Sequence, residues 1–155
     1  FEECYKKISE SDENVDIDYK SDLKDKSTSD LLEQSLDIDM AYKYTTKGIH
    51  KDDLKFKIMG QSIRKFGSQG QQKSFLIALK IAQFNFMKNN FKTNPIVLLD
   101  DIFDKLDNTR VKKIIKLFKN QKMGQIFISD TDENRIKKVL TPLKDSYEIF
   151  DLNSI

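Results

Sequence analysis

The sequence predicts an α/β protein in which parallel strands alternate with helices. Two short apolar runs, 96–99 ("IVLL") and 126–128 ("IFI"), each end in polar residues. Between them, residues 108–120 repeat apolar side chains at helical spacing. A strand, a helix and a second strand in this order are typical of a parallel α/β unit.

The first half of the chain has a mixed pattern. Residues 14–23 alternate apolar and polar side chains and predict a half-buried strand. Residues 27–44 begin with capping residues and predict a helix, and 47–53 predict a loop. Alternation over 54–60 predicts another strand, which ends at a glycine turn. The pattern of apolar and polar residues changes near residue 48, which predicts a domain boundary between 1–47 and 48–155.

The second half is more apolar. Residues 74–87 are apolar nearly all round and predict a helix buried on most sides. Four apolar residues in a row at 96–99 predict a strand buried on both faces, as in parallel sheets. The helix at 108–120 is amphipathic, with an apolar stripe opposite its lysines. A buried strand over 125–131, a short helix and a last strand over 147–152 complete the prediction.

Composition excludes several classes of protein. No apolar run approaches the ~18 residues that a membrane span needs. Cys4 is the only cysteine, which excludes an internal disulfide and predicts a reducing, cytoplasmic compartment. His50 is the only histidine, so His and Cys residues cannot assemble a zinc site. Because the chain begins with Phe1 rather than Met, we expect it to be a piece of a longer protein.

Paired acids follow the first buried strand. Asp100 and Asp101 stand at its expected carboxyl end, where ligands gather in open α/β sheets. Two adjacent carboxylates need a compensating cation or hydrogen bonds. Mg²⁺ suits such a site, because it accepts sparse carboxylate contacts and retains waters. The alternative is a solvated turn in which the aspartates cap the next helix.

The stretch "RKFGSQGQQKSF" (64–75) precedes the helix at 74–87. Ser68 followed by Gln71 has the spacing of a capping box. That local role leaves Gly67 and Gly70 unexplained, since glycine is expected where backbone is strained or approaches a ligand closely. A helix start with free N–H groups binds anions, so the same residues could cap the helix and hold a phosphate.

The order and spacing of these motifs resemble the second half of an ABC-type ATPase. "SQGQQ" (68–72) is similar to the signature motif, "IVLLDD" to Walker B, "KLD" (105–107) to the D-loop and "ISDT" (128–131) to the switch strand. More narrowly, "GIHKDDL", "FGSQGQQ", "LDD" and "LD" closely resemble the RecF family, densely from Gly48 to Thr131. Residues 1–47 resemble the end of that family's inserted arm domain. The implied fold is the C-terminal lobe of an ABC-type ATPase, an incomplete parallel-sheet P-loop core.

The resemblance implies an active site shared by two subunits that sandwich ATP. Asp100 would hold Mg²⁺ through water, and Asp101 would polarise the attacking water. The implied contacts to ATP on the opposite subunit come from the signature residues Ser68, Gln69, Gly70, Gln71 and Gln72. The implied coupling and γ-phosphate-sensing residues are Leu106 and Asp107 of the D-loop and Ser129, Asp130 and Thr131 of the switch.

The resemblance also implies partners. The family forms ATP-dependent homodimers on double-stranded DNA near single-strand gaps, and it helps to load recombinase with the mediator proteins RecR and RecO. Candidate contacts to DNA phosphates are the basic residues Arg64, Lys112, Lys113 and Lys116. The alternative for these lysines is a solvated helix face.

Several departures from the family pattern bear on activity. Asp101 stands where transporter-type relatives have glutamate, so we expect slow hydrolysis. The chain has no Gly-x-x-x-x-Gly-Lys-Ser/Thr loop, so we expect a C-terminal fragment that is inactive alone. Two alternatives stay open: another DNA-repair ATPase of the SMC kind, and an interaction module that keeps the fold without turnover.

Overall fold

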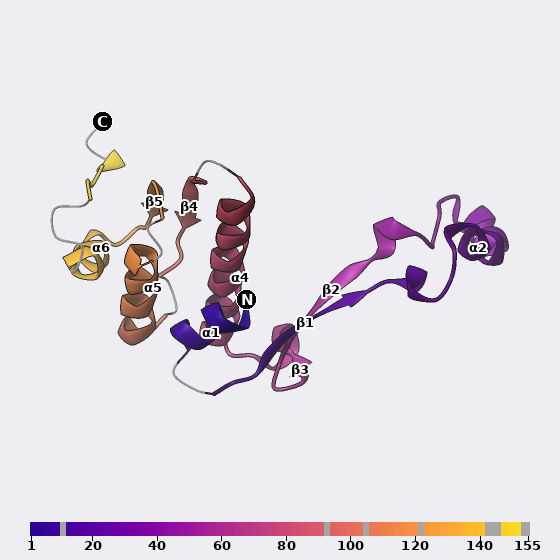
Figure 1. Ribbon diagram of the computed structural model, residues 1–155, viewed down its shortest axis with the longest axis horizontal. Coiled ribbons are helices and arrows are strands. Elements are labelled where there is room, and N and C mark those ends of the chain that lie inside the picture. The colour runs from indigo at the N-terminus through magenta and orange to yellow at the C-terminus, as the bar shows by residue number, and fades with distance from the viewer. Residues whose placement is uncertain (10–11, 92–93, 104–105, 121–122, 142–146, 153–155) are drawn as a thin grey trace. The chain divides into compact units, whose positions relative to one another are not determined.

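The computed structural model describes residues 1–9, 12–91, 94–103, 106–120, 123–141 and 147–152. The chain divides into two compact units, of which the first combines 1–13 with 67–155 and the second is 14–66. Figure 1 labels the elements of both units. Each unit is considered by itself.

The second unit is built on a three-stranded antiparallel sheet in the order β1–β2–β3. Its strands are β1 (Val15–Lys20), β2 (Asp53–Ile58) and β3 (Gln61–Ser62). The pairing of β1 with β2 sets Ile17 opposite Phe56 on one face and Asp18 opposite Lys55 on the other. Opposite charges across the strands favour this register. A shift by one residue would place charged side chains opposite apolar ones, and a shift by two would bring like charges together.

Helices complete the second unit. The helix α2 (Thr28–Tyr42) begins where the Ser27 hydroxyl accepts a hydrogen bond from the Asp30 N–H at 3.2 Å, as the capping residues predict. It ends at Lys43, whose φ of 60° is left-handed. Three single-turn elements occur besides it, namely η1 (Asp22–Lys24), η2 (Ile49–Lys51) and α3 (Ile63–Phe66). The predicted loop at 47–53 therefore contains one helical turn.

The change in pattern near residue 48 does not coincide with a boundary between compact units. Residues on both sides of it lie in the unit 14–66. The physical reason is that β1 and β2 pair along their whole lengths across this point of the sequence. The assignment of 1–47 to an arm and 48–155 to an ATPase head stays a prediction about a family pattern.

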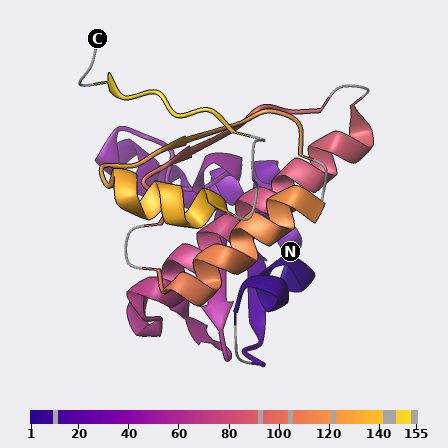
Figure 2. The same ribbon diagram turned by 90° about the vertical axis from the view of Figure 1, so that its left-hand side faces the viewer.

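The first unit contains the predicted parallel strand–helix–strand. The strands β4 (Val97–Asp100) and β5 (Ile126–Ser129) are parallel neighbours, joined through the helix α5 (Asn108–Asn120). The remaining helices are α1 (Glu2–Ile8), α4 (Gln69–Asn90) and α6 (Glu133–Leu140). The helix α1 packs on α4 and α5, and α5 and α6 lie side by side (Figure 2).

The core of this unit follows the predicted stripe of α5. Val111, Ile114, Ile115 and Phe118 are all buried, with Ile114 fully so. Aromatic contacts join α1 to α4, since the ring centroids of Tyr5 and Phe75 are 6.1 Å apart. The amphipathic pattern therefore identified the buried face of α5 correctly.

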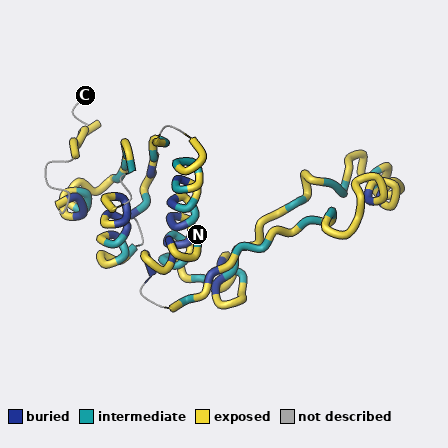
Figure 3. Tube along the Cα trace, in the orientation of Figure 1, coloured by how far each residue is buried: buried dark blue, intermediate teal, exposed yellow. Residues whose placement is uncertain are grey.

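Burial of the two parallel strands differs from the prediction. Leu99 is 8% exposed, whereas its neighbour Leu98 is 74% exposed and Phe127, opposite Leu98, is 49% exposed. The expectation of strands buried on both faces is wrong for the described residues. Successive side chains point to opposite faces of a sheet, and exposed residues alternate with buried or half-buried ones along β4 and β5 (Figure 3).

Two further predictions are corrected. The helix at 74–87 extends over the whole of α4, and it is not buried on most sides, because Leu76 and Phe86 are 55% and 67% exposed. Its core face is the stripe that includes Phe75, Ala78 and Ile81. The predicted strand at 147–152 is not formed, because no other strand among the described residues pairs with it.

Candidate functional site

The first turn of α4 forms the predicted capping box. The Ser68 hydroxyl accepts a hydrogen bond from the Gln71 N–H at 3.2 Å, and the Gln71 side-chain oxygen accepts one from the Ser68 N–H at 2.7 Å. The Gln72 amide donates to the Gly67 carbonyl at 2.9 Å. These bonds fix where the helix begins and hold the preceding glycine against its first turn.

The same turn presents polar groups to solvent. Ser68, Gln69 and Gln72 are exposed, and Gly70 is half-buried within the helix. Because Gly70 has helical backbone, a left-handed φ does not explain its presence. What glycine provides here is a first turn without a side chain, next to helix N–H groups that favour an anion.

Gln71 has a partner that the sequence did not suggest. Its Nε2 donates to the Glu13 carboxylate at 2.7 Å, and the same carboxylate accepts the Tyr5 hydroxyl at 2.7 Å. Burial, followed by this bond to Glu13, raises the pKa of Tyr5. The signature turn is thereby tied to the N-terminal segment, and the separation of 58 residues in the chain explains why no local pattern revealed it.

The acids after β4 lie beside the end of β5. The parallel register places Asp100 opposite Ser129, and the Ser129 hydroxyl donates to the Asp100 carboxylate. Both residues are exposed. Two predicted site residues from separate motifs therefore meet at the carboxyl ends of neighbouring strands, where α/β sheets bind ligands.

Asp101 has an unusual backbone conformation. Its φ of 46° lies in the left-handed region, where non-glycine residues are uncommon. Its N–H donates to the Ser129 carbonyl at 3.2 Å, and its own carbonyl accepts the Lys73 ammonium at 2.9 Å. The exposed carboxylate lies 3.9 Å from the Arg135 guanidinium. Such conformations persist where the surroundings hold them and are frequent at functional sites.

Asp130 is the buried member of the switch motif. Its side chain is fully buried, and Oδ1 accepts the Arg135 Nη2 at 2.5 Å and the Asp132 N–H at 2.8 Å. The hydrogen bond between Asp130 and Arg135 is the largest of the effects that raise the pKa of Arg135. Among the described residues, the second Asp130 oxygen has no hydrogen-bond partner. Thr131 is exposed.

We expect Asp130→Asn to lower the free energy of unfolding by about 2 kcal/mol, because it removes the carboxylate that is hydrogen-bonded to Arg135 and leaves only Asp101, 3.9 Å away, as a counter-ion. Arg135 is partly exposed, which keeps the expected loss below that of a fully buried pair. Urea denaturation of the variant measures the effect. Thr131→Ala is the matched control and should change stability by less than about 0.5 kcal/mol. Equal stabilities of both variants would contradict a structural role for this pair.

The D-loop residues Leu106 and Asp107 lie immediately before α5. The Leu106 N–H donates to the Phe103 carbonyl at 3.3 Å. Asp107 caps the helix, since its carboxylate accepts the Arg110 N–H at 2.8 Å and lies 3.4 Å from the Arg110 side chain. Lys105, which the motif also includes, lies outside the described residues. In this structure Asp107 therefore has a local structural role, and its coupling role stays a prediction.

The candidate phosphate contacts are dispersed. Lys112 and Lys116 are exposed on α5, which contains no acidic residue, whereas Lys113 donates to the Ser9 carbonyl at 3.3 Å. Arg64 is exposed in α3 of the other unit. His50 is bonded locally, with Nε2 3.1 Å from the Thr45 carbonyl.

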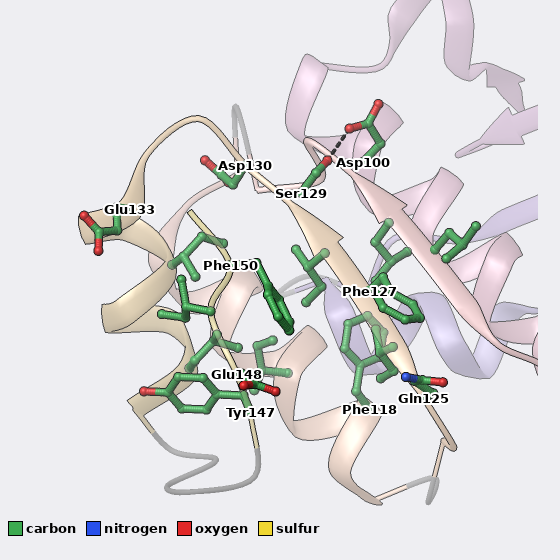
Figure 4. A pocket seen from close by; sticks show the side chains of 18 of the residues that line it. Asp100, Phe118, Gln125, Phe127, Ser129, Asp130, Glu133, Tyr147, Glu148 and Phe150 are labelled. Carbon is green, nitrogen blue, oxygen red and sulfur yellow. Dashed lines mark hydrogen bonds between the residues drawn. The ribbon is translucent and has the colours of Figure 1, made fainter. Parts of the chain in front are cut away.

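A pocket of about 1360 Å³ lies beside these strands, lined by residues of β4, β5, α5, α6 and 147–152. Figure 4 shows that Asp100, Ser129 and Asp130 lie together at one end, whereas Phe118, Tyr147 and Phe150 belong to its apolar remainder. The candidate site residues of this pocket therefore lie at the strand ends, whereas other polar residues, among them Gln125 and Glu148, line its opposite end.

Two residues near the acids were missed as candidate site residues. Lys73 reaches Asp101 from α4, and Arg135 reaches both Asp130 and Asp101 from α6. Arg135 had only the signal of a basic cluster, and Lys73 only its place after the glycine-rich turn. Both contacts require helices to pack against the ends of strands, and the spacing of apolar residues along the sequence does not predict such packing.

Two negative findings accompany the site. Within the described part of the chain, no group of three His, Cys, Asp or Glu side chains could hold a metal ion. Nor do the described residues include a helix long and apolar enough to cross a membrane.

The proteins most similar to this chain in the comparisons below belong to the family that its motifs resemble. No protein-family model matches the chain. It is 50% identical over 145 residues to the DNA replication and repair protein RecF of Flavobacterium johnsoniae, covering 94% of the chain and 40% of the relative. It is 46% identical over 150 residues to the RecF of Azobacteroides pseudotrichonymphae, covering 97% and 41%.

A solved structure of the recombination mediator protein RecF with ATP matches with a TM-score of 0.62 and 26% identity, over 86% of this chain and 38% of that one. A second RecF structure gives a TM-score of 0.63. The α/β fold is therefore that of an ABC-type ATPase over part of its length, and the chain spans about 40% of the length of the curated relatives. These matches bear out the resemblance to RecF that the motifs indicate: the chain is similar to RecF proteins over about 40% of their length.

Proposed function

We propose that the chain belongs to an ATP-dependent protein of DNA replication and repair and supplies part of its ATPase head. One observation carries the proposal. A single unit combines the capped signature helix with paired acids at the carboxyl end of β4, beside the end of the parallel strand β5, and Lys73 of that helix bonds to Asp101. The names of the relatives, and a related structure that contains ATP, support the same function.

In this proposal ATP binds between two copies of the protein. The exposed start of α4 faces the phosphates of ATP held by the opposite subunit, through Ser68 and the N–H groups of Gln69 and Gly70. Gln71 and Gln72 hold this turn in place through their bonds to Ser68 and Gly67. Helix N–H groups and the positive end of the helix dipole supply the attraction. Leu106 and Asp107 lie at the turn that joins the acids to α5, where they connect one site with the other.

Asp100 fits a role in holding Mg²⁺. It is exposed, stands at a strand end and has its carboxylate oriented by the Ser129 hydroxyl. The small number of acidic side chains agrees with an ion that keeps most of its waters and takes its other ligands from phosphate. When bound, Mg²⁺ supplies charge neutralisation on the phosphate oxygens.

Asp101 serves as the general base. Its exposed carboxylate accepts a proton from water at the site, while its backbone is held by Ser129 and Lys73. The Arg135 guanidinium lies 3.9 Å from this carboxylate, at the same edge of the sheet. Ser129, Asp130 and Thr131 follow β5 at the same edge, and Ser129 is placed to sense a change at Asp100.

The DNA-related function involves double- and single-stranded DNA, with RecR and RecO as protein partners. The exposed lysines of α5 are suited to DNA phosphates because no acid on that helix offsets them. Lys113 is a secondary candidate, because it already bonds to a backbone carbonyl. Arg64 is also secondary, because it lies in the other unit.

The function is tested with the full-length protein. We expect ATP with Mg²⁺ to shift it from monomer to dimer in sedimentation velocity, and we expect slow release of phosphate. Dimerisation without hydrolysis would favour the alternative of a non-catalytic interaction module. If ATP causes neither dimerisation nor phosphate release, the proposal is contradicted.

A separate expectation concerns DNA. Replacing Lys112 and Lys116 together by Gln should weaken binding to duplex DNA and reduce the slope of log K against log salt by about 2, because each phosphate contact contributes about 0.9. Fluorescence anisotropy at several salt concentrations measures the slope. Lys80→Gln, on α4, is the control and should leave it unchanged. An unchanged slope in the double variant would return these lysines to the solvated-face alternative.

A further inference from the structure

Lys73 joins the signature helix to the acid pair of the same chain. Its ammonium donates to the Asp101 carbonyl at 2.9 Å. Lys73 lies five residues after the cap residue Ser68, which is about 7.5 Å along the helix at 1.5 Å per residue. One side chain therefore connects the first turns of α4 with the turn after β4.

The contact acts on a backbone that needs support. Asp101 has a φ of 46°, and its N–H is bonded to the Ser129 carbonyl of β5. With Lys73 on its carbonyl, both peptide groups around Asp101 are held, one by β5 and one by α4. Hydrogen bonds from a charged donor are stronger than neutral ones, so Lys73 is a substantial part of this support.

Neighbouring cations do not duplicate this role. The Arg135 guanidinium lies 3.9 Å from the Asp101 carboxylate and is bonded at 2.5 Å to Asp130. Arg135 therefore affects the charge near Asp101, whereas Lys73 holds its backbone.

We propose that Lys73 is a positioning residue that aims the Asp101 carboxylate and couples it to the signature helix. This inference rests on the proposed function. The signature turn contacts ATP bound to the opposite subunit, and Asp101 works on ATP bound to its own. A displacement of α4 when the opposite ATP is engaged moves the Asp101 carbonyl through Lys73. Each chain thereby links the two ATP sites of the dimer.

The kinetic test uses three variants of the full-length protein. Lys73→Met keeps the aliphatic stem and removes the donor, and we expect kcat to fall about 10- to 100-fold, as small misplacements of a catalytic group do. KM for ATP should change less than about twofold, because Lys73 acts on chemistry and not on ground-state binding. Lys73→Arg should restore most of kcat. Lys80→Met is the control, since Lys80 is an exposed lysine of the same helix.

A second measurement does not depend on hydrolysis. Hydrogen exchange of peptides that cover Asp101 to Phe103 should be faster in Lys73→Met than in the unmodified protein and unchanged in Lys80→Met. Unchanged exchange in Lys73→Met, or a change of KM with kcat preserved, would overturn the inference. If the unmodified protein does not hydrolyse ATP, the proposed function fails, while exchange still decides whether Lys73 holds Asp101.

Discussion

We expect Ser68→Arg to abolish the ATP-dependent dimer of the full-length protein. Ser68 stands at the mouth of α4, with its side chain exposed and its hydroxyl bonded to the Gln71 N–H. Arginine removes the cap and places a long cation where the phosphate of the opposite subunit would approach. We expect the dimer dissociation constant with ATP to rise at least about 100-fold, equivalent to about 2.7 kcal/mol. Sedimentation velocity at several protein concentrations measures it.

A second variant separates the cap from the ligand contact. Ser68→Ala removes the capping hydroxyl without adding bulk, so we expect it to cost about 1 kcal/mol of stability and to keep a measurable dimer. A normal ATP-induced dimer in Ser68→Arg would contradict the shared active site. Loss of the dimer in both variants, in proportion to lost stability, would reduce Ser68 to its structural role.

We expect Asp101→Asn to stop ATP turnover while still permitting ATP-dependent dimerisation. Asparagine has nearly the same shape, tolerates left-handed backbone, and leaves the backbone bonds to Ser129 and Lys73 in place. It lacks the carboxylate that accepts the proton. We expect kcat to fall about 10²- to 10⁴-fold, the usual contribution of a general base.

Phosphate release and sedimentation on the same samples check this prediction. Asp37→Asn, an exposed acid on α2, is the control and should retain both properties. Unchanged phosphate release in Asp101→Asn would remove Asp101 from its assigned role. A lost dimer would instead assign the carboxylate to assembly.

Local patterns determined much of the fold. The capping box at Ser68, the buried stripe of α5 and the strands around Val97 and Ile126 were all predicted, because each depends on residues within a few positions of one another. Caps and amphipathic faces are set by short-range hydrogen bonds and by helical spacing. The order of the motifs also indicated the resemblance to RecF, which the relatives bear out.

Burial was less predictable. Four apolar residues in a row suggested a strand covered on both faces, yet Leu98 is exposed and Leu99 is buried. Composition reports what a side chain prefers, whereas burial depends on which elements cover each face. The same reason applies to the apolar residues of α4, of which Phe86 is exposed, and to 147–152, which pairs with no other strand among the described residues.

The assembly of the candidate site depends on the packing of the whole unit. Motif order predicts which residues carry the chemistry, namely the signature turn, the paired acids and the switch residues, and these roles stay predictions. The contacts of Ser129 with Asp100, Lys73 with Asp101 and Arg135 with Asp130 depended on parallel pairing and helix packing. Side chains from separate elements meet only when the whole unit is packed, so their partners cannot be deduced from local spacing.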